Sequence, residues 1–409
     1  MEIPAPPVVI ELVRALPGAP QLLQRLDDEP GVHLVGGAVR DLLLDRRPRE
    51  LDLLVEGDPA PIVKRLGGAQ RSHDRFGTAT VTLDGSRYDI AQARRETYAH
   101  PGALPTVAPA SLTEDLLRRD FTVNAAAIAL TGPAAGTLTS APCTLPDLAG
   151  RLLRVMHAQS FRDDPTRLLR MARYAARLEF GVEAHTLALA EAAIAAGALG
   201  GVSGPRVGNE LRLLAREEEP IDALAALDRF GLSDSIASGL GPTDPVLAAG
   251  ALALLPAGGR RDLLMLAAAF AGSGPPPADE LAPALDRLAF DAAERATILE
   301  AATGARELAQ SLRAAGSPSA IAAAVGGRRT ETVALAGALG AAESAREWLG
   351  RLRRIRLEID GEDLLGAGIE PGPRIGAGLR AALAAKLDGG ISGRESELAE
   401  ALRAARASG

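Results

Sequence analysis

The chain has 409 residues, of which 47% are hydrophobic, 3% aromatic and 24% charged, and its formal net charge is −7. This length is too great for one small core, so several domains are expected. The single cysteine, Cys143, excludes an internal disulfide and a zinc site built from several cysteines. The negative charge argues against a surface that binds nucleic acid everywhere, but it is compatible with a local basic surface.

Targeting and membrane signals are not found in the sequence. No basic segment precedes an apolar core near the N-terminus, and the apolar run at 246–255 is too short to cross a bilayer. The sequence therefore predicts a soluble cytoplasmic protein.

The first third of the chain has the pattern of a small sheet. Apolar or alternating runs predict strands at 32–35, 51–55, 78–83 and 88–91, with a short helix at 38–44 and an end to the sheet near residue 149. From residue 163 the period becomes helical. Arginines recur there at a spacing that is typical of a solvated helix face: Arg167, Arg170, Arg173 and Arg177. We therefore predict an α+β fold in which a sheet-and-helix first domain precedes all-α domains.

A glycine pair follows the first predicted strand. Glycines allow a backbone to approach a polyphosphate closely, and the N–H groups of Gly36 and Gly37 can line an anion nest. Arg40 would add positive charge at the same place. The alternative for Arg40 is a salt bridge with Asp41 on the helix surface.

Carboxylates alternate at the start of the second predicted strand. Glu50 and Asp52 stand at i and i+2, so their side chains share a face and can hold metal ions together. Two Mg²⁺ ions on shared carboxylates suit in-line nucleotidyl transfer. Asp89, on a later strand, is a candidate third carboxylate. The alternatives are solvated acids for the pair, and a strand-edge or salt-bridged acid for Asp89.

Two further motifs follow in order. RRDFTVN occupies 118–124 and FRDDPTRLLR occupies 161–170, and SGPR at 203–206 comes before Asn209 and Glu210. Together with the glycine pair and the ExD element, these segments resemble the class II tRNA nucleotidyltransferase and poly(A) polymerase family, within the DNA polymerase β superfamily. The resemblance covers roughly residues 30–230. It implies a catalytic head at 1–155, a helical neck with a nucleotide-recognition motif at 156–215, a body at 216–310 and a tRNA-binding tail at 311–409.

The resemblance also implies roles for the first two motifs. Glu50 and Asp52 would bind the metals, although the family usually has Asp at both positions and Glu is one methylene longer. Asp120 would read the ribose 2′-OH, while Arg119 and Asn124 would position the sugar and phosphates. Without the resemblance, the RRDF segment is an ordinary helix start with an acid near its positive end.

The third motif would select the base. Asp164 and Arg167, at i and i+3 on a helix, share a face. A carboxylate accepts from an exocyclic amine and a guanidinium donates to a ring nitrogen or carbonyl, so the pair could read cytosine or adenine and reject guanine and uracil. Arg170 would also face the site. A compatible alternative is that Asp163 and Asp164 cap a helix whose first turn holds Pro165.

Segment 94–115 is rich in Pro, Gly and Ala and is predicted to be a loop. In the family this region holds a flexible element tied to adding the last A, and here it is not shortened. The helical remainder should hold RNA through basic clusters, for which the alternative is a solvated surface. These candidate clusters are Arg206 with Arg212, and Arg351, Arg353, Arg354 and Arg356.

The resemblance as a whole implies template-independent addition of CCA to the tRNA 3′ end, with Mg²⁺ as cofactor, CTP and ATP as substrates, and pyrophosphate released. The acceptor stem of tRNA would be the partner. The rival activities are addition of A alone, addition of CC alone, and poly(A) synthesis. A rival of another class is an RNA-binding protein whose head has lost catalysis.

Overall fold

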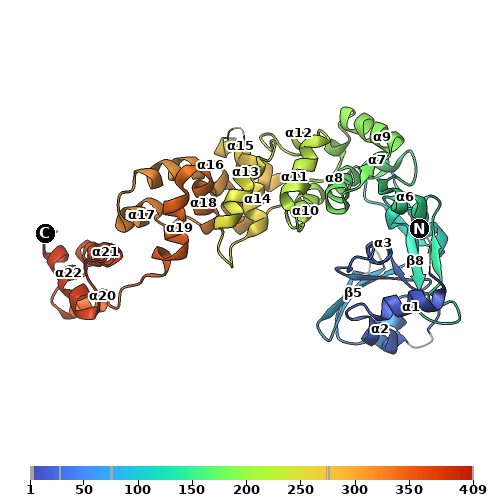
Figure 1. Cartoon of the computed structure of the whole chain (residues 1–409), viewed down its shortest axis with the longest axis horizontal. Helices are drawn as coiled ribbons and strands as arrows, with labels where there is room; N and C mark the ends of the chain where they lie inside the picture. The colour runs from blue at the N-terminus through green and yellow to red at the C-terminus, as the bar shows by residue number, and fades with distance from the viewer. Residues whose placement is uncertain (1–3, 27–28, 74–76, 273, 275–276, 408–409) are drawn as a thin grey trace. The chain divides into compact units, whose positions relative to one another are not determined.

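The computed structural model describes residues 4–26, 29–73, 77–272, 274 and 277–407. The chain forms two compact units, Met1–Glu210 and Leu211–Gly409. The first unit combines a mixed sheet with helices, and the described part of the second is helical (Figure 1). The predicted α+β class is therefore confirmed. The four-part division expected from the sequence stays a prediction.

Within the described residues, the main sheet of the first unit has seven strands in the order β3-β4-β5-β2-β1-β8-β9. β2 pairs with β5 in parallel, and the other neighbours in this sheet pair antiparallel. The strands are β1 (Val32–Val35), β2 (Leu51–Val55), β3 (Ala69–His73), β4 (Thr78–Leu83), β5 (Ser86–Gln92), β8 (Ala126–Ala129) and β9 (Leu138–Ser140).

Side-chain alternation divides the sheet into a core face and a site face. On β2, Leu51 and Leu53 belong to the larger buried core, whereas Leu54 belongs to a smaller core on the other face. Asp52 has the parity of Leu54 and so lies on the face away from the larger core. Four helices contribute to the larger core: α1 (Pro6–Arg14), α2 (Ala19–Leu26), α3 (Gly37–Leu43) and α4 (Ala60–Leu66). The smaller core contains residues of α5 (Leu112–Leu117).

The prediction of a loop at 94–115 is wrong in part. β6 (Arg94–Thr97) and β7 (Thr106–Pro109) form an antiparallel hairpin, and α5 follows it. Two features stabilise this segment: Ser111 caps α5 in a capping box with Glu114, and the buried carboxylate of Asp115 accepts from the N–H of Arg94 at 3.2 Å. The Pro and Gly residues gather in the connection between the strands, which is where turns need them.

Helices dominate the rest of the first unit. The FRDDPTRLLR motif includes a proline before α8, and Asp164 accepts from the N–H of Thr166 at the start of that helix (3.0 Å). The predicted cap differs in detail, because Pro165 is itself the N-cap residue of α8 and Asp164 bonds the first turn from one residue earlier. The helices are α6 (Thr144–Gly150), α7 (Ser160–Asp163), α8 (Thr166–Leu178), α9 (Ala184–Ala195) and the start of α10 (Gly204–Ala215).

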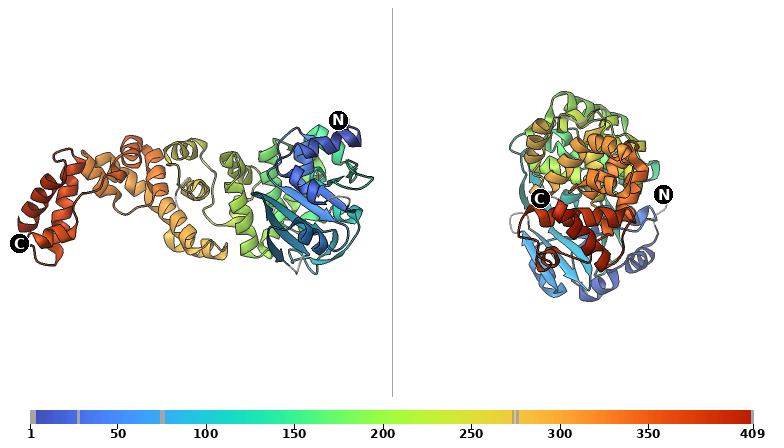
Figure 2. Two further views of the ribbon diagram at one scale, coloured as in Figure 1. Left: turned by 90° about the horizontal axis from the view of Figure 1, so that it is seen from below. Right: turned by 90° about the vertical axis from the view of Figure 1, so that its left-hand side faces the viewer.

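The second unit is built from packed helices (Figures 1 and 2). α14 is buried from Asp262 to Ala271 and forms its centre. A separate small core joins the last three helices, in which α21 and α22 pack side by side. None of the helices in the described part of the chain is long and apolar enough to cross a membrane. The helices are α11 (Pro220–Arg229), α12 (Ser233–Ile236), α13 (Pro245–Leu254), α14 (Arg261–Ala271), α15 (Ala278–Arg287), α16 (Ala292–Ala314), α17 (Pro318–Val325), α18 (Thr330–Ala336), α19 (Ala342–Gly350), α20 (Gly361–Gly366), α21 (Pro373–Leu387) and α22 (Arg394–Ala407).

Candidate active site

A cavity of about 720 Å³ opens on the site face of the sheet, within the first unit. Its wall is polar and carries both carboxylates and arginines, as a site for a charged ligand requires. Most residues predicted from the three motifs lie on this wall. They are Gly36, Gly37, Asp52, Asp89, Arg119, Asp120, Asn124, Asp164, Arg167 and Arg170.

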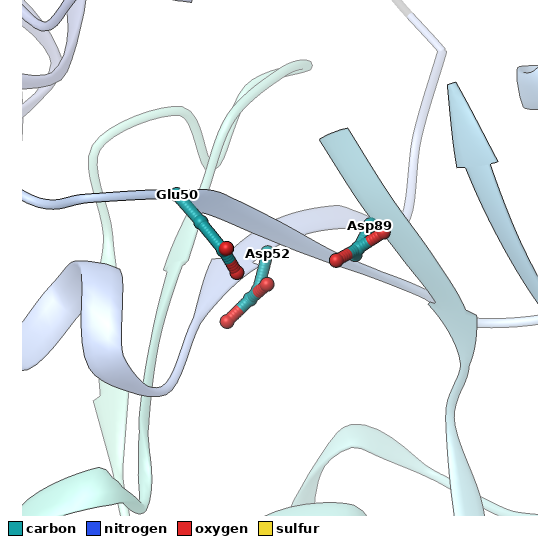
Figure 3. Close-up of side chains that lie close together, drawn as sticks. All are labelled: Glu50, Asp52 and Asp89. Atoms are coloured by element: carbon teal, nitrogen blue, oxygen red, sulfur yellow. The ribbon is translucent and has the colours of Figure 1, made fainter. Parts of the chain in front are cut away.

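Three carboxylates lie close together, and two of them, Asp52 and Asp89, line the cavity (Figure 3). One oxygen from each of Glu50, Asp52 and Asp89 lies within 4.8 Å of the others. The parallel pairing of β2 with β5 sets Asp52 directly opposite Asp89, and Glu50 reaches the pair from the residue before β2. The longer side chain of Glu50 therefore does not remove it from the cluster.

The trio carries unbalanced negative charge. Burial, together with the neighbouring charges of Glu50 and Asp89, raises the pKa of Asp52 to about 6. The negative charge of Asp89 is partly compensated, because its carboxylate accepts a hydrogen bond from Thr80 Oγ1 at 2.6 Å and pairs with Arg87 Nη2 at 2.8 Å. Grouped carboxylate oxygens that repel one another are the donor set that a hard divalent cation prefers. The residues present thus fit Mg²⁺.

The absence of a side chain at Gly36 lets the Arg119 side chain lie close to the backbone. The Gly36 backbone lies at φ +68° and ψ −127°, which side-chain-bearing residues rarely adopt. A Cβ there would lie 2.7 Å from Nη1 of Arg119. The Gly36 N–H donates to the carbonyl of Ala126 at 3.1 Å, so the sheet uses this donor. Gly36 thus leaves room for the guanidinium of Arg119. Its N–H is already bonded within the sheet, so the predicted phosphate contact of this N–H stays a prediction.

Arg40 is not on the cavity wall. It is 1% exposed, and it donates to Asp41 Oδ1 at 2.8 Å and to Asn124 Oδ1 at 2.6 Å. Asp41 also accepts from Arg177 Nη2 at 3.1 Å. The structure does not bring Arg40 to the place predicted for phosphates. Its bonds instead fix the amide of Asn124 from below the cavity.

Asp120 is held as an anion. Burial alone would raise its pKa, but Arg170 and Asn124 outweigh burial and keep the pKa below its ordinary value. Arg170 forks onto Oδ2 at 2.8 and 2.6 Å, and Asn124 Nδ2 donates to Oδ1 at 3.0 Å. The second and third motifs therefore meet at this carboxylate, as two halves of one site.

Asp164 and Arg167 share the cavity, as their spacing predicts. Arg167 is buried and donates to Ser160 Oγ at 2.5 Å and to the carbonyl of Arg118 at 3.0 Å. These bonds hold the guanidinium in one orientation. Arg206 from α10 pairs with Asp164 at 2.7 Å and also lines the cavity. Base reading by this pair stays a prediction.

The arginine stripe on α8 is not a solvated face. Arg173 is 7% exposed and Arg177 bonds Asp41, so both are built into the first unit. Tyr174 also lines the cavity and was not among the residues predicted from the sequence. Its ring lies 4.8 Å from the Arg173 guanidinium and 5.7 Å from that of Arg170. The signal was its place four residues after Arg170, on the same helix face.

Several arginines of the two clusters predicted to bind RNA form bonds to acids or backbone carbonyls of this chain. Arg212 donates to Glu294 and to the carbonyl of Ala289, and it stacks 4.0 Å from the ring of Phe290. Arg212 thus anchors α10 residues to the second unit's own helices. In the tail cluster, Arg351 pairs with Glu347 and Arg353 donates to a backbone carbonyl.

Acids on neighbouring strands, beside a cavity lined with arginines, form an arrangement that suits metal-dependent nucleotidyl transfer. Residues 32–154 match the family described as Poly A polymerase head domain. This match to the first part of the chain agrees with the resemblance that the motifs carry to poly(A) polymerases and tRNA nucleotidyltransferases.

Curated relatives resemble the chain in about half of its length. An A-adding tRNA nucleotidyltransferase from Geobacter sulfurreducens is 42% identical over 206 residues, which cover 49% of this chain and 23% of the relative. A CC-adding tRNA nucleotidyltransferase from Deinococcus radiodurans is 40% identical over 215 residues, covering 51% of this chain and 56% of the relative. The matched region thus spans between 23% and 56% of the length of these relatives.

Solved structures resemble it over nearly its full length. The apo form II of a CCA-adding enzyme has a TM-score of 0.78 and 29% identity, and covers 97% of this chain and 96% of its own. The Thermotoga maritima CCA-adding enzyme complexed with tRNA has a TM-score of 0.74 and 27% identity, with 98% and 99% covered. A complex of a CCA-adding enzyme with CTP has a TM-score of 0.76 and 27% identity, with 98% and 99% covered.

Proposed function

We propose that this protein is a metal-dependent nucleotidyltransferase that adds CCA to the 3′ end of tRNA, using CTP and ATP and releasing pyrophosphate. The observation that carries the proposal is the Glu50, Asp52 and Asp89 trio, of which Asp52 and Asp89 line the arginine-lined cavity. Two Mg²⁺ ions on these carboxylates would stabilise charge on the attacking and leaving oxygens. The similarity to CCA-adding structures across almost the whole chain supports the choice of tRNA.

The chain's own residues bind and orient the substrates in this proposal. Arg94, Arg118 and Arg119 supply positive charge on the cavity wall for a triphosphate. Asp120, kept ionised by Arg170, would accept from a ribose hydroxyl. Asp164 and Arg167 present an acceptor and a fixed donor to the Watson–Crick edge of cytosine or adenine. Positioning by such groups lowers the barrier by removing freedom before reaction.

Addition of A alone is the second candidate. Two A-adding enzymes are 42% and 41% identical to the chain in the matched regions, and a CC-adding enzyme is 40% identical. The hairpin β6–β7 bears on the choice, because it forms part of segment 94–115, which the family resemblance ties to adding the last A. Poly(A) synthesis and a noncatalytic RNA-binding role remain the other rivals.

Incorporation assays separate these activities. Labelled CTP and ATP, separately and together, would be offered to tRNA transcripts that lack CCA, CA or A. We expect completion of CCA from the shortest transcript. Extension of only the CC-ended transcript with A would identify an A-adding enzyme, and extension that stops after CC would identify a CC-adding one. Long A tracts on unrelated RNA would indicate a poly(A) polymerase.

Replacing Asp52 tests the metal assignment. We expect Asp52→Ala to abolish incorporation and to leave tRNA binding intact, because the carboxylate serves the reaction and not the RNA body. Asp58→Ala, on an exposed turn of the same unit, is the matched control. Normal incorporation by the Asp52 variant would refute the assignment, and no incorporation by the wild type on any end would favour the noncatalytic role.

A further inference from the structure

A second cavity, of about 410 Å³, lies in the first unit next to the acidic trio. Glu50 lines this cavity, Asp52 and Asp89 line the first one, and Arg87 lines both. The carboxylates therefore stand between two cavities. The residues of the second wall are Leu16, Pro17, Arg47, Pro48, Arg49, Glu50, Leu51, Gly85, Ser86 and Arg87.

The framework of the second cavity is fixed by packing. Tyr88 is fully buried, and its hydroxyl donates to the carbonyl of Gly18 at 2.9 Å. This bond ties the α1–α2 connection to β5. A Cβ on Gly18 would lie 2.8 Å from Ser86 Oγ, so the α1–α2 connection packs closely against the start of β5. The cavity is thus a feature of the folded unit.

The charge of this wall is strongly positive. Arg47, Arg49 and Arg87 face one carboxylate, that of Glu50. Arg47 and Arg49 are exposed, and 57% of the Arg87 side chain is exposed while it pairs with Asp89. Exposed guanidinium groups around a hollow favour a ligand with several phosphates, since each offers a fork of donors to phosphate oxygens.

We propose that the second cavity binds backbone phosphates of the single-stranded 3′ end of the RNA substrate. This inference rests on the proposed function. In nucleotidyl transfer the attacking and leaving oxygens are roughly in line through phosphorus, so the RNA hydroxyl and the leaving pyrophosphate approach the acids from opposite sides. The first cavity has its own arginines for the triphosphate. The second one gives the RNA strand a cationic path that ends at Glu50.

Steady-state kinetics of the full chain test this. Arg47→Gln/Arg49→Gln should raise the KM for a tRNA transcript lacking CCA roughly tenfold, while the KM for CTP stays unchanged. The slope of log KM against log salt should fall by about 1.4, because two single-strand phosphate contacts are lost. The matched control is Arg14→Gln/Arg65→Gln, which removes the same charge from exposed positions of the same unit. Arg47→Lys/Arg49→Lys should keep most of the affinity.

Several results would overturn the inference. An unchanged KM for tRNA would do so, and so would an equal rise in the control. A rise in the KM for CTP without one for tRNA would assign the cavity to the triphosphate. Binding of a short single-stranded RNA, measured in parallel by fluorescence anisotropy, needs no catalysis. Weaker binding by the glutamine variant alone would therefore support the cavity's role even if the wild type failed to extend tRNA, and unchanged binding would contradict it.

Discussion

Arg206 Nη2 lies 2.7 Å from Oδ1 of Asp164 and joins α10 to the start of α8. Within the described part of the chain, the hydrogen bonds to this carboxylate go to Oδ1, from Arg206 and from the backbone and hydroxyl of Thr166. Arg206 also donates to the carbonyl of Gly102, in the β6–β7 connection, at 3.0 Å. One arginine thus links the proposed base-reading acid to the hairpin.

Removal of Arg206 should loosen base selection. Without it, Asp164 keeps the Thr166 cap but can rotate, so its free oxygen no longer meets the base in one orientation. We expect Arg206→Ala to raise the incorporation of GTP and UTP relative to CTP by about tenfold, the worth of one charged hydrogen bond. The ratio of kcat/KM values on one tRNA measures it. Arg206→Lys cannot bond Asp164 and the carbonyl of Gly102 with one forked group, so its ratio should fall between those of the wild type and Arg206→Ala. An unaltered ratio for Arg206→Ala would contradict the role of Arg206 in base selection.

Arg40 should matter chiefly for stability. Arg40→Met leaves Asp41 and the Asn124 amide buried with fewer partners, and breaking such a buried pair costs about 3 to 5 kcal/mol. Chemical denaturation followed by circular dichroism measures the change. The exposed pair Arg14 with Glu11 provides the control, because Arg14→Met should cost less than about 1 kcal/mol. Equal losses in the two variants would show that the buried network is worth little.

Gly36 should tolerate no side chain. Gly36→Ala places a Cβ 2.7 Å from Arg119 Nη1, so we expect lower stability together with a large loss of incorporation. Gly132 is a matched control, because it has φ +71° and nothing within 4 Å of an added Cβ. Gly132→Ala should cost about 1 kcal/mol for its backbone conformation and leave activity intact. Similar activity in the two variants would refute the seating of Arg119.

Asp262 should make the second unit sensitive to acid. Burial alone would raise its pKa, but Arg260 and Arg216 outweigh burial and lower it from 3.8 to about 2. The folded pKa lies below the unfolded one, so the stabilisation is complete above about pH 4 and is lost as the pH falls towards 2. Asp262→Asn should therefore cost roughly 1 to 2 kcal/mol at neutral pH, discounted because both arginines are about half exposed.

Thermal melting of the wild type and Asp262→Asn across this pH range checks the prediction. The difference between their melting temperatures should shrink as the pH falls from 4 to 2. A constant difference would show that the carboxylate stabilises the unit without titrating in this window.

Strong local patterns predicted much of the sheet. The strands at 32–35, 51–55 and 78–83 were found with those bounds, since apolar runs and alternation ended at glycines or charged residues. β8 was not predicted, because Ala126–Ala129 is alanine-rich and alanine favours helix. Burial on both faces of the sheet overrides that preference, and no local signal reports it.

The site was predicted as a set of residues, and its internal bonding was not. Spacing could place Asp164 with Arg167, but it could not show that Arg40 lies below the cavity or that Arg206 reaches Asp164. Those contacts join residues that are 84 and 42 positions apart. Such pairings depend on how elements pack, which a single sequence does not encode locally.

The pairing of Asp52 with Asp89 depends on the length of a surface turn that lies outside the carboxylate cluster. β4 and β5 are joined by Asp84 and Gly85, both with positive φ, in a two-residue turn. Strand side chains alternate, so deleting one residue between this turn and Asp89 would turn the acid into the core. The turn can accept new side chains that tolerate its backbone. A change in its length would displace Asp89, and so would be as damaging as replacing the carboxylate itself.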